Sequence, residues 1–191
     1  MVPERFATER LVLRRFHRRD AEAVAEAVRA SMPELQQWLP WAHPGYGRDE
    51  ATAFIRESSQ AWRDGRAFDF AMRDLGRPWL HLGNASIWFV SRMGRTGEIG
   101  YWVRSDRAGN GVATEATAAL VELGFDELGL HKINLRIAVG NLASERVAAK
   151  LGFHREGILR EELLIGGQWV DHTLFSLLER EHRHSPVATE G

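Results

Sequence analysis

A short glycine-containing segment, residues 107–116, offers the clearest chemistry in the chain; it reads Arg-Ala-Gly-Asn-Gly-Val-Ala-Thr-Glu-Ala. It follows the apolar run 99–103 and opens a helical pattern that extends to about residue 129. At a strand–turn–helix junction, free backbone N–H groups and the positive end of the helix dipole converge. Gly109 and Gly111 remove side chains that would obstruct an approaching anion. The segment therefore predicts a pyrophosphate-binding loop.

Two well-known phosphate loops do not fit this segment. A Walker A loop requires Lys-Ser or Lys-Thr after the glycines, and neither follows here. The dinucleotide fingerprint requires a third glycine where Thr114 stands, and an acidic residue in the next strand, which residues 132–139 lack. An ordinary tight turn that caps a helix remains the alternative for the glycine pair alone.

A second block, residues 141–153, follows the alternating apolar pattern of a strand. Asn141 is predicted to be a helix N-cap, and Gly152 is predicted to stop the helix. One helix face is small and mostly apolar with a single hydroxyl, and it comprises Ser144, Val147, Ala148 and Leu151.

Together these two blocks resemble the GNAT superfamily of acyl-CoA-dependent N-acetyltransferases. The first is similar to its Gln/Arg-x-x-Gly-x-Gly/Ala motif, and the second to its Asn-x-x-Ser/Ala block that ends in Leu-Gly-Phe. Further stretches resemble the RimJ/RimL-like branch, which acetylates protein N-termini, notably of ribosomal proteins, and small amines. They are residues 8–14, 97–102, 156–160 and 167–171, so the resemblance covers about residues 8–180.

The resemblance implies acetyl-CoA as co-substrate and no metal. It places the pantetheine arm against the backbone of one strand and the diphosphate on the loop. The implied cofactor-binding residues are Trp102, Val103, Arg107, Ala108, Gly109, Asn110, Gly111, Val112, Ala113, Thr114, Asn141 and Ser144. Ala108 stands where the family often has Gln or Arg, and Arg107 lies one place earlier, so the backbone donors carry this prediction.

The catalytic candidates are Glu98, Ser144 and Asn141. Glu98 would take the amine proton directly or through a water; the alternative is an exposed charge at a hairpin end. Many GNAT members supply the thiolate proton from a Tyr at the position of Ala148, so Ser144 is the candidate here, as in RimL-like members. A helical Ser is more often a backbone hydrogen bonder. Asn141 would cap the helix and also hold the pantetheine arm or acceptor, whereas Tyr101 is assigned to the core.

The acceptor is predicted to meet Trp38 and Trp41, which lie in the region that lines the acceptor groove in this superfamily. The alternative is that both tryptophans seal the core. We expect an N-acetyltransferase that acts by direct transfer, since no Cys exists to carry the acetyl group. A protein or peptide N-terminal amine is the favoured acceptor. The alternatives are a small-molecule amine (an amino acid, polyamine or antibiotic) and a non-catalytic acyl-CoA-binding module.

Composition agrees with a compact enzyme. The formal charge of −1 argues against a general nucleic-acid binder, and eight scattered histidines with no Cys do not suggest a metal site. Neither a signal-peptide pattern nor an apolar run of membrane length is present, so a cytoplasmic location without membrane partners is expected. The expected partners are acetyl-CoA and the amine acceptor, with a homodimer left open.

The elements that must position these residues form a mixed α+β pattern, predicted to be a mainly antiparallel sheet of about seven strands with helices on both faces. One acetyltransferase domain is predicted over residues 1–183, with a disordered tail at 184–191. Predicted strands are 10–16, 67–73, 80–89, 98–103, 132–139, 153–164 and 169–178. Predicted helices are 20–30, 33–38, 49–64, 111–128 and 142–151.

Overall fold

One eight-stranded sheet organises the molecule, which we describe from a computed structural model over residues 1–184. The strands are β1 (Arg5–Ala7), β2 (Leu11–Arg15), β3 (Ala67–Asp74), β4 (His81–Ser91), β5 (Thr96–Val103), β6 (Lys132–Ala138), β7 (His154–Ile165) and β8 (Gln168–Leu178). Their order is β1-β2-β3-β4-β5-β6-β8-β7, and every neighbouring pair is antiparallel except β5 and β6. The predicted mixed fold with a mainly antiparallel sheet is confirmed.

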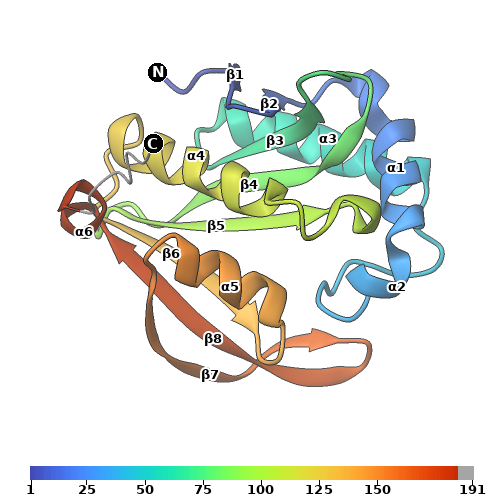
Figure 1. Ribbon diagram of the computed structural model, residues 1–191. Helices are drawn as coiled ribbons and strands as arrows, with labels where there is room; N and C mark the ends of the chain where they lie inside the picture. The colour runs from blue at the N-terminus through green and yellow to red at the C-terminus, as the bar shows by residue number, and fades with distance from the viewer. Residues whose placement is uncertain (185–191) are drawn as a thin grey trace.

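Helices cover both faces of this sheet (Figure 1). They are α1 (Ala21–Ala30), α2 (Met32–Leu35), α3 (Arg48–Arg63), α4 (Val112–Asp126), α5 (Leu142–Lys150) and α6 (Glu179–His184). On one face α4 packs on β4 and β5, and α5 packs on β6; on the other, α1 packs on β4 and α3 packs on β3. Because both faces are covered, residues 70–73 of β3 and 81–85 of β4 are continuously buried rather than alternating.

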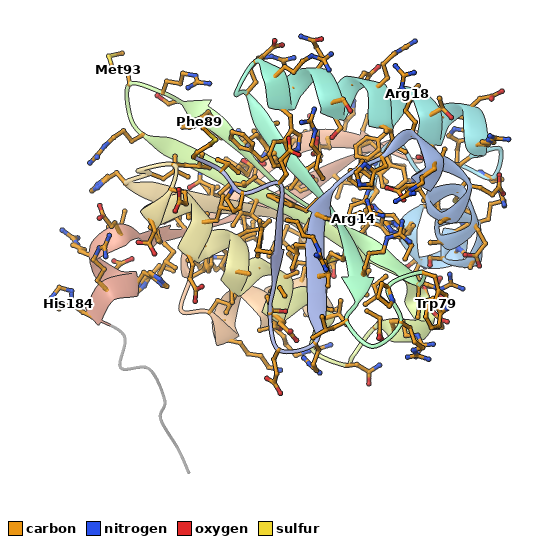
Figure 2. All side chains as sticks on the ribbon, turned by 90° about the horizontal axis from the view of Figure 1, so that it is seen from above. Arg14, Arg18, Trp79, Phe89, Met93 and His184 are labelled. Carbon is orange, nitrogen blue, oxygen red and sulfur yellow. The ribbon has the colours of Figure 1, made fainter. Side chains whose placement is uncertain are left out.

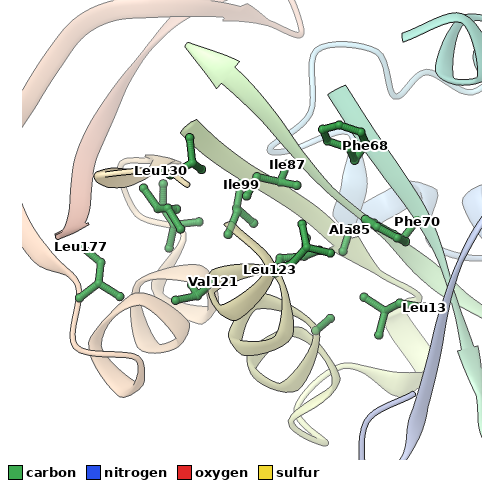
Figure 3. Packing of buried hydrophobic residues seen from close by; sticks show 14 of the residues in the cluster. Leu13, Phe68, Phe70, Ala85, Ile87, Ile99, Val121, Leu123, Leu130 and Leu177 are labelled. Carbon is green, nitrogen blue, oxygen red and sulfur yellow. The ribbon is translucent and has the colours of Figure 1, made fainter. Parts of the chain in front are cut away.

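Two hydrophobic clusters hold these layers together. Figure 3 shows part of the first, in which Ile87 and Ile99 of the sheet lie with Val121 and Leu123 of α4. The second lies under α1 and α3 and includes Trp102 of β5. The alternation of strand side chains between two faces thus sends Ile99 and Trp102 into different clusters, and β5 runs between the two cores.

A buried ion cluster links β2, β3 and the start of α1. Asp20 accepts hydrogen bonds from Arg14 (Nη1 to Oδ2, 2.7 Å) and Arg73 (Nη2 to Oδ1, 2.9 Å). Burial alone would raise the pKa of Asp20, but the bonds from Arg14 and the His17 backbone and the charge of Arg73 lower it to about 2. Arg14 lies near the middle of the view in Figure 2, and its side chain is 17% exposed. Removing one partner of such a buried pair costs about 3–5 kcal/mol, so the cluster fixes this side of the fold.

The feature that opens the fold is the divergence of β5 from β6. The two strands pair only from Thr96 to Glu98 and then separate like the arms of a V (Figure 1). The remainder of β5, from Ile99 to Val103, has no strand on its β6 side within residues 1–184. Its backbone groups on that side are free to pair with an extended ligand.

The predicted elements are confirmed, with their bounds shifted by one or two residues in most cases. The helix predicted over 33–38 is shorter, because the α2 helix ends at Leu35 and turns follow. The sheet has eight strands rather than about seven, since β1 contains only three residues, too few for a periodic pattern to be recognised in the sequence. Of the predicted tail 184–191, His184 instead ends the short polar helix α6, and residues 185–191 lie outside the described residues.

Trp79 and Met93, in the turns that flank β4, lie far apart at the periphery (Figure 2).

Candidate active site

The glycine loop before α4 has the geometry of an anion site. Gly109 and Gly111 adopt φ of +77° and +79°, a conformation that favours glycine. Within the described chain, no acceptor bonds the backbone amides of residues 109–111. The first residues of α4 add amides that lack intrahelical acceptors, because a helix leaves its first turn unpaired. A run of consecutive amides therefore lies open at the positive end of a helix dipole.

The loop is held from behind by an ion pair. Arg10 donates through Nη1 to the carbonyl oxygen of Asn110 at 2.9 Å, and through Nε to Glu115 Oε2 at 2.7 Å. The Asn110 carbonyl is thus turned onto Arg10. The Asn110 side chain bonds back to the carbonyls of Arg107 and Ala108. These contacts fix the loop so that the carbonyl oxygens of Arg107, Ala108 and Asn110 are hydrogen-bonded, while the amides of residues 109–111 stay free.

The amides face a cavity of about 440 Å³, which we call the loop cavity. It lies between the loop, the free end of β5, the α2 region and α5. Three cationic side chains line it, Arg107, Arg146 and Lys150, against one carboxylate, Glu34. The loop cavity is therefore shaped for an anionic ligand.

Nearly all the predicted cofactor-binding residues meet in this one cavity. Those that line it are Trp102, Val103, Arg107, Ala108, Gly109, Gly111, Val112, Ala113, Thr114, Asn141 and Ser144. Asn110 does not line it, because its side chain is turned back onto the loop. Trp38, which was predicted to meet the acceptor together with Trp41, also lines the loop cavity, whereas Trp41 does not.

A second cavity of about 710 Å³, the aromatic cavity, lies on the α1/α3 face of β4 and β5. Trp41, Tyr46 and Trp102 form one wall; the Trp41 ring centroid lies 5.6 Å from Tyr46 and 6.2 Å from Trp102. Trp41 keeps 38% of its surface exposed, so it does not seal the core. Other lining side chains are Phe54, Trp88, Asn84 and Ser86.

The titratable side chains of the aromatic cavity are mostly acidic. Glu50 and Glu57 line it together with His43, and neither Lys nor Arg does so within residues 1–184. Glu50 is already engaged, since its Oε2 accepts from the Gly47 amide at 3.0 Å and its Oε1 lies 3.8 Å from His43 Nε2. Those backbone bonds and His43 lower the pKa of Glu50. Glu57 is exposed and has neither a hydrogen bond nor an ion pair to the described residues.

The two cavities share a boundary made by Leu39, Tyr101 and Trp102. The Tyr101 hydroxyl is buried and has no well-formed hydrogen bond to the described residues. Burial raises the pKa of Tyr101, which the neighbouring Ser144 hydroxyl partly offsets. The phenol is therefore protonated at neutral pH and lies at the junction of the two cavities.

Asn141 and Ser144 occupy the start of α5. Asn141 Oδ1 accepts from the Ser144 amide at 3.1 Å, so the predicted N-cap is confirmed. Both side chains line the loop cavity, and the Ser144 hydroxyl faces Tyr101. Ala148, where many relatives carry a Tyr, is fully buried.

Glu98 lies at the fork where β5 and β6 separate. Glu98 is only 5% exposed, so the alternative prediction, an exposed charge at a hairpin end, is wrong. Both carboxylate oxygens accept from Arg136 Nε, at 2.8 and 2.9 Å. Burial raises the pKa of Glu98, and Arg136 opposes this. Glu98 lines neither cavity; its cross-strand neighbour Trp88, whose ring packs on Gly100, lines the aromatic one.

Several residues that line the cavities were not singled out from the sequence. Arg146 and Lys150 stand four residues apart on α5, a spacing that already indicates one helix face. Glu57 and Asn84 gave no comparable signal, because they come from elements that meet only in the folded chain. Tyr101 was assigned to the core, and the structure places it between the cavities.

A family model described as acetyltransferase (GNAT) domain matches residues 10–154, a span that includes the β5 edge and the glycine loop and runs through α5. The chain belongs to the GNAT acetyltransferase family. With the homologues below, this identifies it as an N-acetyltransferase.

The sequences of several relatives match almost the whole length of this GNAT acetyltransferase. The ribosomal protein uS5-alanine N-acetyltransferase of Escherichia coli strain K12 is 30% identical over 185 residues, which span 92% of this chain and 92% of that protein. YnaD, an uncharacterized N-acetyltransferase of Bacillus subtilis strain 168, is 30% identical over 174 residues, 91% of this chain and 96% of that protein. The solved structure of Mycobacterium smegmatis RimJ in complex with CoA-disulfide matches with a TM-score of 0.82 at 30% identity, covering 90% of this chain and 83% of that one.

Residues 1–184 contain neither a membrane-spanning helix nor a cluster of metal-binding side chains. None of the helices there is long and apolar enough to cross a membrane. Groups of three or more His, Asp or Glu side chains that could hold a metal ion are likewise absent from that part of the chain.

Proposed function

We propose that this N-acetyltransferase transfers the acetyl group of acetyl-CoA directly to the N-terminal amine of a protein or peptide. One observation carries the proposal: two cavities of opposite charge meet at Tyr101 and Trp102. An anionic donor fits one cavity and a cationic acceptor fits the other, so both substrates would converge at the shared boundary.

The residues of the loop cavity fit acetyl-CoA. The open amides of residues 109–114 suit a diphosphate, and Arg107, Arg146 and Lys150 supply positive charge beside them. The free edge of β5 suits the amides of a pantetheine arm, which would add to the sheet as a further strand. Such a pose directs the thioester toward Tyr101 and Ser144.

The aromatic cavity fits an amine. Glu50 and Glu57 favour a protonated amine by charge, and the faces of Trp41 and Trp88 attract cations as well. A free carboxylate on the acceptor would be repelled by the same two glutamates. The charge therefore favours a peptide N-terminus over a free amino acid.

The proposed reaction is a direct displacement. The neutral amine nitrogen attacks the acetyl carbonyl carbon, and the carbon–sulfur bond then breaks. Ser144, beside the protonated phenol of Tyr101, gives its proton to the thiolate and regains one from the former amine nitrogen, which loses it to become the amide. Asn141 holds Ser144 in place through its cap and contributes to the wall of the loop cavity. Glu98 would accept the amine proton through a water, because it lines neither cavity.

The names of two relatives support this acceptor class. The Escherichia coli relative is named for an alanine of ribosomal protein uS5, and a solved structure from Vibrio fischeri is named as a ribosomal-protein-S5-alanine acetyltransferase. A small-molecule amine is the second candidate, since a cavity of about 710 Å³ would enclose one entirely.

The test is CoA release from acetyl-CoA with a panel of acceptors at equal concentration. The panel contains tripeptide amides with varied first residues, free amino acids, spermidine and an aminoglycoside. We expect at least one peptide to exceed every small amine about tenfold in kcat/KM. Preference for a small amine would replace the acceptor assignment, and absence of release with every amine would contradict the enzymatic proposal.

A further inference from the structure

Asn84 stands out among the polar residues of the aromatic cavity. It lies on β4 directly opposite Trp102, the residue shared by both cavities, and only 7% of its surface is exposed. Its amide oxygen pairs with His81 Nε2 at 3.0 Å. Its amide nitrogen has no hydrogen bond to the described residues. Asn84 lines the aromatic cavity, and its nitrogen is not one of the buried polar atoms that lack a partner, so the unpaired N–H groups reach the cavity surface.

His81 decides this orientation of the amide. The ring is 2% exposed, and burial together with the charge of Arg73 lowers the pKa of His81 to about 3, so it is neutral at physiological pH. A neutral ring carries one N–H. With that proton on Nε2, the buried Nδ1 keeps only a lone pair unpaired. The flipped amide would require an orphaned buried N–H at Nδ1, which folded proteins rarely contain.

The His81 ring is itself held in place by the residues around it. Arg73, whose charge acts on the His81 ring, is held by Asp20 in the ion cluster between β2, β3 and α1. Phe16 and Trp102 flank the ring, with centroids 6.2 and 5.8 Å away. The fold thus orients an amide that then uses only half of its hydrogen-bonding capacity. Its free N–H groups lie at the surface of the aromatic cavity, where an oxygen atom of a ligand can take the place of water.

We propose that Asn84 binds the carbonyl oxygen next to the reacting amine of the acceptor, with His81 as its positioning residue. This inference rests on the proposed function and sharpens it. The site would select amines that carry a neutral carbonyl on the adjacent carbon, which a peptide N-terminus has and a polyamine lacks. An acceptor carboxylate would meet Glu50 and Glu57 instead of a neutral wall.

The experiment compares two acceptors that differ only in this carbonyl. One is a tripeptide amide that turns over in the panel, and the other is its trans-alkene isostere, in which a carbon–carbon double bond replaces the first peptide bond. We expect the wild-type enzyme to prefer the peptide by about tenfold in kcat/KM, the value of one well-placed hydrogen bond to a buried donor.

Asn84→Asp keeps the shape of the side chain and replaces its donors with oxygen. We expect about a tenfold loss with the peptide, no loss with the isostere, and therefore a ratio near one. His81→Phe leaves the amide free to turn, and the ratio should fall about threefold. Ser86→Ala, on the same strand and lining the same cavity, is the matched control and should leave the ratio unchanged.

Several outcomes would overturn the proposal. A wild-type enzyme that treats both acceptors alike has no carbonyl site. If Asn84→Asp lowers both rates equally in a protein that melts normally, Asn84 is only structural. If Asn84→Asp does not fold, Asn84→Ala, which also lacks a donor, supplies the same ratio by the same criteria. Absence of CoA release with every amine would instead contradict the proposed function, so the two failures are distinguishable.

Discussion

The loop cavity and the aromatic cavity are built in different ways. The loop cavity takes its anion-binding groups from the backbone of one continuous segment, residues 109–114, and adds cations from α5. The aromatic cavity takes its character from side chains on α3, β4, β5 and the segment that carries Trp41. Backbone amides change little when side chains are replaced, whereas a side-chain wall changes with each substitution. Under the proposed function, we therefore expect a constant donor site beside an adaptable acceptor site.

The first way to test this comparison is at the shared boundary, where the largest effect is expected. Ser144→Ala should slow the chemical step in single-turnover kinetics by ~10²–10⁴-fold, the usual value of a general acid, with unchanged acetyl-CoA affinity. Tyr101→Phe should cost about fivefold, because the phenol stands beside the donor without replacing it. If Tyr101→Phe shows the larger loss instead, the proton comes from Tyr101 and Ser144 only orients it.

A second test concerns the carboxylates on the acceptor side. Glu98→Gln should lower kcat about 10²-fold near neutral pH, and the loss should shrink at high pH, where the amine is already neutral. Glu57→Gln should raise the acceptor KM severalfold without changing the pH profile, since Glu57 lines the cavity only as a charge. A pH–rate profile for Glu98→Gln identical to wild type would leave Glu98 as the structural partner of Arg136.

A third test concerns the glycine loop, where the main effect is expected to be smaller than those of Ser144→Ala and Glu98→Gln. Gly109→Ala adds a methyl group where the diphosphate would approach, and we expect acetyl-CoA affinity to fall about tenfold in calorimetric titration. Gly129→Ala is the matched control, because both glycines have positive φ and open space at the added carbon. Both variants should lose about 1 kcal/mol of stability from the same backbone strain. Gly111 is less suitable, since its added carbon would lie 2.9 Å from Arg10 Nη2. Equal affinity in the two variants would argue against the loop as the diphosphate site.

The sequence predicted the loop cavity well and the aromatic cavity poorly. The signals of a nucleotide-type loop are local, because glycines at fixed spacing and a helix start lie within a few residues of each other. Asn141 and Ser144 could be placed for the same reason, as one cap and one helix turn define them. Trp38 and Trp41 were predicted to lie in the same groove. Trp41 lines the aromatic cavity, whereas Trp38, three residues earlier, lines the loop cavity. A turn after α2 directs the two rings apart, and no periodicity records that turn.

The sequence by itself determined the mixed fold, nearly every long element, the family resemblance and the donor loop. Only the tertiary structure decided that Glu98 is buried against Arg136, that Tyr101 lies between two cavities, and that the Asn84 amide oxygen pairs with His81. The physical reason is the range of the interactions. Helix caps, glycine φ values and hydrophobic periodicity act between near neighbours in the chain. Burial, ion pairing and cavity shape depend on residues that are distant in the chain and meet only when the strands have paired.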